Sequence, residues 1–562
     1  MSDPVFDQAY VSAVTCAADR SAAQVRASLQ DRHEWSHRVL MDRVKLLVAC
    51  VLNQESQFYD DASLKADALS LAEALRQLQE PSGFFRSGDN LVSPPDSSFT
   101  INDVCDVLEM LRGAGEERSH TWHQVSTVLH EIADLAEPAL LAGGIHTPNH
   151  RWEISAALAR LHRRRPSKAL ASRVADWLGE GIDIDSDGMY SERSANYAAQ
   201  VSNPSLEVVG DVFARGELHD CVVRNLVATV PLILPDGSVE TVHSRRQDQK
   251  EVFSVAPYLT ALRRWAIATG RGDLSWAAQY ALEQPIGFPS TALAEMLLHP
   301  DIKGTLPPAT VPPRKQQTEL AGSSLVVDAG ERRTLVLFGG SDYATMGRVR
   351  SGLANSPTFM RMFADDVVLD TVRLSRNFFG LGPFRPDRLE RDGPGFVFHE
   401  TVAASYYHPL PREHRRRDGH YVLEDEGRFA AAMAFSQRGR DVVELSTRAH
   451  VVPTEKGARI DLAFQGPRTD WALEMTFRGG DISGGSTLTG GDVQLTEGTA
   501  VCRKGGSTLA VSVAGDTEAG VPPRYNPGEE YEYLGGTDAT TGRHLYVTGL
   551  TTGHVSITIE SV

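Results

Sequence analysis

The chain has 562 residues and a formal net charge of −17, with 41% hydrophobic and 23% charged residues. A chain of this length is expected to form two or three domains with large cores. The negative charge argues against a general nucleic-acid binder, whose surface is usually basic, and any site for an anionic ligand must therefore rest on local positive charge.

The cysteines and the N-terminus bear on the cellular compartment. The five cysteines are odd in number, lie far apart and form no CxxC pair, which favours reduced and mostly buried thiols. The opening residues, MSDPVFDQAY, lack the basic and apolar regions of a secretory signal. Apolar runs such as VKLLVACVL are far shorter than the roughly 20 residues of a membrane span. We therefore expect a cytoplasmic protein that does not enter a membrane.

Residues 1–300 carry a helical pattern. Arg38–Asn53 and Ser63–Gln79 repeat apolar residues at spacings of three and four, and several later segments do the same. Many of the apolar stripes are wide, so these helices are expected to be covered on more than one side. A long succession of helices with no strand pattern between them predicts an α/α toroid or an α-solenoid, and the lack of a short fixed repeat disfavours the solenoid.

The pattern changes after a linker. The stretch His299–Gln317 is rich in proline and polar residues, and we place the linker at residues 301–320. Residues 321–562 then alternate short β-branched segments, such as SSLVVDAG and HVSITIES, with Gly, Asp and Asn turns. This pattern predicts an antiparallel β-sandwich. The predicted fold class is an α/α toroid followed by an antiparallel β-sandwich domain.

The stretch TPNHRWEISAAL places Asn149 and His150 where a helical pattern opens. One interpretation is that Asn149 only caps the helix. The other is that the amide and the imidazole sit at a helix start, where the dipole favours an anion, and bind a carboxylate there.

The loop Asp187–Tyr197, DGMYSERSANY, carries Tyr190, Arg193 and Tyr197. A loop tyrosine often only caps a carbonyl with its hydroxyl. A phenol can also take a proton from carbon if a nearby cation lowers its pKa, and Arg193 is a candidate for that cation. The alternative is that Arg193 pairs with a neighbouring acid such as Glu192.

Two further loops carry candidate binding residues. The segment Pro235–Phe253 supplies His243, Arg245 and Arg246. In a cleft these arginines would bind carboxylates in a bidentate way, whereas on an open loop they would be solvated. Ser82–Val104 is predicted to be a long polar loop; with Arg86 it would either line a sugar-binding groove or simply cap the helical domain.

Together these motifs resemble the heparinase II/III-type polysaccharide lyases, which include several alginate lyases. That family joins an α/α toroid to an antiparallel β-sheet domain, and its motif has Asn-His at a helix start followed by a DG-x-x-x-E/H-x-S-x-x-Y loop. The matching residues here are Asn149, His150, Asp187, Gly188, Glu192, Ser194 and Tyr197. The order and spacing fit, and the two-domain outline covers nearly the whole chain.

The β-domain departs from the family pattern. Many members open it with a His-rich segment and an apolar strand, whereas the comparable stretch here, Gly352–Leu374, has Asn355 and Thr358. A metal or a second catalytic histidine is therefore not carried over to this stretch. His399 is the substitute catalytic candidate and Tyr406 a substrate-binding candidate, with ordinary strand residues as the alternative. No group of residues has a recognised metal-ligand spacing, so we expect no cofactor, and a structural divalent metal in the β-domain stays open.

The resemblance implies β-elimination on a uronic-acid-containing saccharide. Asn149 and His150 would neutralise the carboxyl group, with help from Arg245 or Arg246, and stabilise the enolate-like intermediate. Tyr197 would protonate the leaving oxygen and could also act as the base, a role open to His150 or a β-domain histidine as well.

Two other readings stay open at this point. A glycoside hydrolase on a similar toroid would need paired carboxylates, for which Asp103, Glu153, Asp187 and Glu192 are available. A non-catalytic carbohydrate-binding protein would bind uronate oligomers without turnover. The predicted partner in each case is a saccharide, anionic for the lyase, and the protein is expected to be a monomer or a homodimer.

Overall fold

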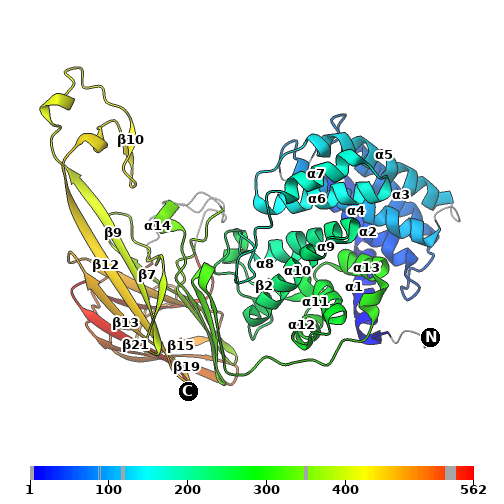
Figure 1. Cartoon of the computed structure of the whole chain (residues 1–562). Coiled ribbons are helices and arrows are strands. Elements are labelled where there is room, and N and C mark those ends of the chain that lie inside the picture. Colours follow the sequence, from blue (N-terminus) through cyan, green and yellow to red (C-terminus); the bar gives the residue numbers. More distant parts are fainter. Residues whose placement is uncertain (1–5, 87, 89, 116–119, 347–351, 526–538) are drawn as a thin grey trace. The chain divides into compact units, whose positions relative to one another are not determined.

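The computed structural model describes residues 6–86, 88, 90–115, 120–346, 352–525 and 539–562. The chain divides into two compact units, the first made of Met1–Val239 and Phe253–Pro312, the second of Glu240–Val252 and Pro313–Val562. Figure 1 shows helices in the first unit, coloured blue to green, and mainly strands in the second, coloured green to red. The short segment Glu240–Val252, which holds three of the predicted binding residues, thus belongs to the second unit.

The helices of the first unit pair along the chain. They are α1 Gln8–Ala27, α2 His37–Leu52, α3 Ala62–Leu78, α4 Pro94–Ala114, α5 His120–Ala142, α6 Pro148–Arg164, α7 Lys168–Leu178, α8 Ala195–Tyr197, α9 Asn203–Phe213, α10 Gly216–Thr229, α11 Leu259–Thr269, α12 Gly272–Leu282 and α13 Pro289–Leu298. Two short strands, β1 Ser238–Val239 and β2 Phe253–Ser254, pair with each other.

The helical unit is an α/α toroid. Helix α2 packs against α3, α4 against α5, α6 against α7, α9 against α10 and α11 against α12. The first member of each pair also meets its neighbours in the order α2, α4, α6 and α9, and α13 contacts both α11 and α2. The inner helices therefore form a ring with their partners outside it, which confirms the predicted toroid. Within the described ranges, no helix combines the length and apolar character that crossing a membrane requires.

One boundary differs from the prediction. The polar loop predicted over Ser82–Val104 ends early, because α4 begins at Pro94. Ser93 caps this helix by accepting a hydrogen bond of 3.1 Å from the Asp96 backbone N–H, and Pro94 fits the first helical turn, where no backbone N–H is needed. The prediction was wrong beyond Ser93 because the cap and the proline were read as loop residues.

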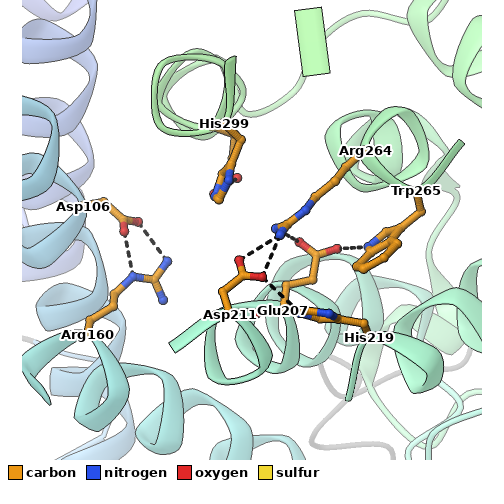
Figure 2. Close-up of polar contacts among 9 residues, drawn as sticks. Asp106, Arg160, Glu207, Asp211, His219, Arg264, Trp265 and His299 are labelled. Carbon is orange, nitrogen blue, oxygen red and sulfur yellow. Dashed lines mark hydrogen bonds and ion pairs between the residues drawn. The ribbon is translucent and has the colours of Figure 1, made fainter. Parts of the chain in front are cut away.

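Ion pairs tie α11 to α9 and α9 to α10 (Figure 2). Arg264 on α11 lies 3.2 Å from Glu207 and 2.8 Å from Asp211, both on α9. Trp265 donates its indole N–H to Glu207, and His219 on α10 lies 3.0 Å from Asp211. Burial raises the pKa of Glu207, and the charge of Arg264 opposes that shift. The contact between these inner helices is thus polar and depends on Arg264.

A second polar cluster joins α4, α6 and α9. Glu153 on α6 accepts hydrogen bonds from Asn102 (2.6 Å) and Ser205 (3.2 Å). Arg160 lies seven residues after Glu153 on α6 and donates hydrogen bonds to Asn102 (3.1 Å) and to Asp106 (2.6 Å). Figure 2 shows the contact between Arg160 and Asp106. Burial raises the pKa of Glu153 to about 7. This carboxyl group therefore releases its proton less readily than an exposed glutamate.

The second unit is a β-sandwich. Its strands are β3 Gln316–Leu320, β4 Leu325–Ala329, β5 Thr334–Phe338, β6 Met360–Ala364, β7 Val367–Arg376, β8 Leu389–Asp392, β9 Gly395–Tyr407, β10 Glu424–Asp425, β11 Ala430–Ala431, β12 Arg440–Pro453, β13 Gly457–Gln465, β14 Asp470–Phe477, β15 Asp481–Ser483, β16 Ser486–Thr487, β17 Val493–Gln494, β18 Gly498–Lys504, β19 Ser507–Gly515, β20 Arg543–Leu550 and β21 His554–Ser561, with a short helix α14 at Tyr343–Met346.

The two large sheets of this unit are nearly all antiparallel. One has the order β15-β18-β19-β21-β13-β12-β9-β8, the other β16-β17-β20-β14-β7-β6-β5-β4-β3. Among the described residues of the two sheets, only the short β17–β20 pairing is parallel. Residues from both sheets share one hydrophobic core, with Leu335 and Leu374 from one sheet and Phe398 and Ile460 from the other. Alternation along β21, where Val555, Ile557 and Ile559 are buried, shows how the sequence directs one face inward. The predicted sandwich is confirmed.

Candidate active site

The first turn of α6 presents the predicted amide and imidazole. Thr147 is the N-cap residue and Pro148 takes the first helical position, so Asn149 is inside the helix and does not cap it. The capping alternative for Asn149 is therefore wrong. Asn149 is 1% exposed and His150 is 7% exposed, so both polar side chains are buried at the start of the helix. Buried polar groups are nearly always hydrogen-bonded, so the partner of this amide identifies the next residue of the site.

That partner comes from the tyrosine-bearing loop. The Asn149 side-chain N–H donates a hydrogen bond of 2.6 Å to a carboxylate oxygen of Glu192, 43 residues further along the chain. Glu192 is itself buried. A hydrogen bond from an amide to a carboxylate is stronger than one between neutral groups, and it orients the amide. The structure thus brings together the two halves of the motif, α6 and the Asp187–Tyr197 loop.

The loop has a defined backbone. Gly188 has φ +85°, and a Cβ there would lie 2.9 Å from the backbone oxygen of Arg224, so only glycine fits without a shift. Arg193 also has positive φ, at +52°. Ser194 then caps α8 by accepting a hydrogen bond of 3.0 Å from the Tyr197 backbone N–H. Tyr197 is half-buried, and this cap fixes its position relative to Glu192.

Tyr190 lies deeper than Tyr197. It is buried, and its hydroxyl donates a hydrogen bond of 2.8 Å to Asn203, which in turn donates to Asn225 at 2.9 Å. Burial raises the pKa of Tyr190 well above its usual value. This phenol is therefore held protonated inside the helical unit. Its predicted role in substrate binding stays a prediction.

Arg86 lies on the loop between α3 and α4. Its side chain is 61% exposed, lies 3.7 Å from Glu80 and donates to the backbone oxygen of Gln77 at 3.1 Å. These contacts anchor Arg86 to the end of α3. The distance and the exposure make the contact between Arg86 and Glu80 a weak surface ion pair, so exchanging Glu80 for another partner would cost little free energy.

In the second unit, the segment Glu240–Val252 carries His243, Arg245 and Arg246. Arg245 makes a bidentate pair with Asp342, with Nε and Nη2 each 2.8 Å from a carboxylate oxygen. His243 is fully buried and Arg246 is half-buried. The charge of Arg245 is thus already balanced within this unit, and a substrate carboxylate would have to compete with Asp342 for it.

The structure does not bring His399 and Tyr406 together. Both lie on β9, seven residues apart, and residues at an odd spacing on a strand point to opposite faces. The imidazole of His399 hydrogen-bonds the Ser446 hydroxyl at 3.0 Å. Tyr406 is 60% exposed and packs edge-on against Phe379, with ring centroids 5.8 Å apart. At most one of these two residues can serve a single site on the sheet.

The sequence pattern singled out Asn355 but did not predict that its side chain is buried. It is fully buried, and neither polar atom of its side chain has a hydrogen-bond partner among the residues that the structure describes. Its backbone is held by Gln249 and Arg385. An amide and the Thr358 hydroxyl do not make a divalent metal site, and in the described ranges no group of three or more His, Cys, Asp or Glu residues could hold a metal ion.

The carboxylates that a hydrolase would need are engaged within the helical packing. Asp103 pairs with Lys45 at 2.6 Å, and Glu153 is bound by Asn102 and Ser205. Glu192 is bound by Asn149. Because each of these carboxylates already has a partner, none of the three stands ready as a solvated general base.

Comparisons with solved structures support the fold. The chain is similar to a chondroitin AC lyase from Streptomyces coelicolor A3 (TM-score 0.52, 12% identity), covering 98% of this chain and 79% of that one. It is also similar to a Paenibacillus xanthan lyase (TM-score 0.56, 9% identity), covering 99% of this chain and 57% of that one. The chain thus spans less than two thirds of the xanthan lyase. No protein-family model matches the sequence, and no curated protein matches it either.

At these identities the likeness concerns the fold. Both of these proteins are polysaccharide lyases, so the resemblance inferred from the motifs is confirmed at the level of architecture: a helical toroid followed by an antiparallel β-domain. The activity and the substrate have to be argued from the site.

Proposed function

We propose that the protein is a polysaccharide or oligosaccharide lyase that cleaves a uronic-acid-containing glycan by β-elimination and leaves an unsaturated uronate. The single observation that carries the proposal is the hydrogen bond of 2.6 Å from Asn149 to Glu192. It fixes the amide at the start of α6 and links it to the loop that ends in Tyr197. The similarity in fold to two polysaccharide lyases supports the same class of reaction.

The reaction begins at the carbon next to the carboxylate of the sugar. A base removes the proton from C5, the electron pair forms the C4–C5 double bond, and the C4–O4 bond breaks. The leaving oxygen takes up a proton from an acid. No water is added, so the product carries a double bond at its new non-reducing end.

The residues of α6 would stabilise the charge that develops on the carboxyl group. Glu192 accepts one N–H of the Asn149 amide, which leaves the second N–H of that amide for an oxygen of the substrate carboxylate. His150, buried in the same turn, would donate to the same group. Donors that are fixed before the reaction stabilise the transition state without having to reorganise during it.

Tyr197 would act on the protons. Its hydroxyl would protonate O4 of the leaving sugar, and in a syn elimination the same side chain, starting as the phenolate, would first take the C5 proton and then pass it to O4. The Ser194 cap holds Tyr197 at the end of the Glu192 loop, so the acid and the amide are positioned by one short segment. The roles predicted for Arg86, Arg193, Tyr190, His243, Arg245, Arg246, His399 and Tyr406 stay predictions.

The test is a screen of uronate oligosaccharides with the full-length protein. Alginate, glycosaminoglycan, glucuronan, ulvan and xanthan-type oligomers are incubated with the protein, new ultraviolet absorbance is followed and product masses are determined. Elimination gives an absorbing product whose mass, added to that of its partner fragment, equals that of the substrate. Hydrolysis gives products whose summed mass exceeds that of the substrate by one water, with no new absorbance. That result would contradict the proposal.

A further inference from the structure

A pocket of about 530 Å³ lies beside the proposed reaction centre in the helical unit. Its volume falls within the range of about 300–1,000 Å³ that is usual for small-ligand sites. The residues that line it come from two segments, the approach to α4 and the connection between α5 and α6. They are Asn90, Leu91, Val92, Ser93, Pro94, Pro95, Gly144, Ile145 and His146.

The pocket adjoins the α6 site through two histidines. The ring of His146, in the pocket wall, packs edge-on against the ring of His150, with centroids 4.7 Å apart. His150 is in the first turn of α6, next to Asn149. A saccharide whose uronate reaches His150 would therefore place a neighbouring sugar unit at this pocket.

The two walls of the pocket are held in place. Asp96, buried at the start of α4, accepts hydrogen bonds from the backbone N–H (2.9 Å) and the side-chain N–H (3.0 Å) of Asn90. A Cβ added at Gly143 would lie 2.7 Å from Pro94, so the segment before α6 packs tightly against the start of α4. The pocket is therefore part of the folded unit and needs no rearrangement to form.

The lining combines aliphatic residues with the polar side chains of Asn90, Ser93 and His146. Of the described lining residues, none is Asp, Glu, Lys or Arg, and five are Leu, Val, Pro or Ile. Leu91 is 97% exposed and Val92 is 68% exposed, although a folded protein usually buries such side chains. Val92 also has φ +48°, a backbone conformation that a β-branched residue rarely adopts. Backbone strain of this kind clusters at active sites and ligand clamps, and at Val92 it coincides with the pocket lining.

We propose that this pocket binds a neutral sugar unit that carries a methyl group, either in an acetyl substituent or as the C6 of a 6-deoxy sugar. A charged uronate would find no Lys or Arg in the lining, whereas a methyl group would remove apolar surface of Leu91, Val92 and Ile145 from water. The proposal rests on the proposed function in one respect, because it takes the sugar to be the neighbour of the uronate that is cleaved.

The test is binding of single sugars, measured by saturation-transfer NMR with the full-length protein. Two matched pairs are compared: fucose with galactose of the same hand, and N-acetylglucosamine with glucose. We expect the methyl protons to receive the strongest saturation and the methyl-bearing sugar of each pair to bind about tenfold more tightly, which is the usual worth of one such group in an apolar pocket. A preference in only one pair identifies which of the two methyl sources the pocket takes.

Leu91→Ser should abolish the preference, and because Leu91 is almost fully exposed this change leaves the fold intact. The control is Val311→Ser, which also replaces an exposed aliphatic side chain by serine but lies outside the pocket lining. Equal binding within both pairs, no methyl saturation in any sugar, or a preference that survives Leu91→Ser would overturn the proposal. Single sugars contain no bond for a lyase to cleave, so this result is independent of the screen for elimination.

Discussion

Asn149 and Glu192 form a buried hydrogen bond of 2.6 Å that joins the first turn of α6 to the loop ending at Tyr197. The contact turns two short and separate motifs into one unit. It also makes Glu192 a positioning residue, because a carboxylate that accepts one N–H of an amide determines where the other N–H points. The first two predictions below follow from this relationship.

Replacing Glu192 should misplace the side-chain amide of Asn149 and leave the fold intact. We expect Glu192→Ala to lower kcat about 100-fold, since a small misplacement of a positioning group can cost that much. Glu192→Gln should recover much of the loss, because its amide oxygen can accept the same hydrogen bond from Asn149. Steady-state rates of both variants on the substrate found in the screen provide the measurement. If the two variants were equally impaired, the orienting role of the Glu192 oxygen would be refuted.

Removing the Tyr197 hydroxyl should stop the chemistry. We expect Tyr197→Phe to lower kcat by about 10² to 10⁴, the usual contribution of a general acid or base, with KM little changed. The control is Tyr280→Phe, which removes the hydroxyl of a half-buried phenol that donates to the Pro235 backbone oxygen at 3.0 Å in the same unit. Turnover by Tyr197→Phe at the rate of this control would show that another residue is the acid.

The buried Glu153 should make stability depend on pH. Its pKa is raised by burial to about 7 from an ordinary value of 4.5. Between these values the unfolded chain has released the proton and the folded chain has kept it, so the free energy of unfolding falls as the pH rises through this window. The fall amounts to about 1.4 kcal/mol for each pKa unit of difference.

Glu153→Gln mimics the protonated carboxyl group at every pH. The variant should therefore have a higher Tm than the parent protein at pH 8 and an equal Tm near pH 4.5, while Glu283→Gln, an exposed control, should show no such divergence. Thermal unfolding across this pH range is the measurement. A Glu153→Gln variant less stable than the parent at pH 8 would mean that the ionised carboxylate is the stabilising form.

The ion pairs between α9 and α11 should be costly to break. Arg264→Met would leave Glu207 without its cation and Asp211 with His219 as its remaining partner, and we expect a loss of about 3–5 kcal/mol in the free energy of unfolding of the helical unit. Arg271→Met removes the exposed pair with Asp273 and should cost less than about 1 kcal/mol. Urea unfolding followed by helical circular dichroism distinguishes the two, and equal costs would show that the α9–α11 contact does not depend on charge.

Local sequence patterns predicted the elements better than they predicted the site. The helix expected over Arg38–Asn53 is α2, His37–Leu52, because its apolar spacing is regular along the whole segment. The start of α4 was missed because Ser93 and Pro94 signal a turn and a helix start equally well. The Asn149–Glu192 bond could not be predicted, since it depends on how α6 packs against a loop 43 residues away.

Strand geometry would have allowed one further inference. His399 and Tyr406 were proposed together from a run of polar and aromatic residues, yet their odd spacing on a single strand already excludes a shared face. By contrast, the membership of Glu240–Val252 in the second unit depends on long-range contacts such as Arg245 with Asp342 and Arg361 with Glu240. No local pattern in the sequence reports contacts of that kind.

The pairing of β1 with β2 has a consequence for how such a fold diversifies. The two strands hold the ends of Glu240–Val252 side by side, so the segment between them is a closed loop. The entropy of closing a loop grows only slowly with its length. The length of this segment can thus change at little entropic cost to the ring of helices, while exchanges within it have to preserve the pairs of Glu240 with Arg361 and of Arg245 with Asp342.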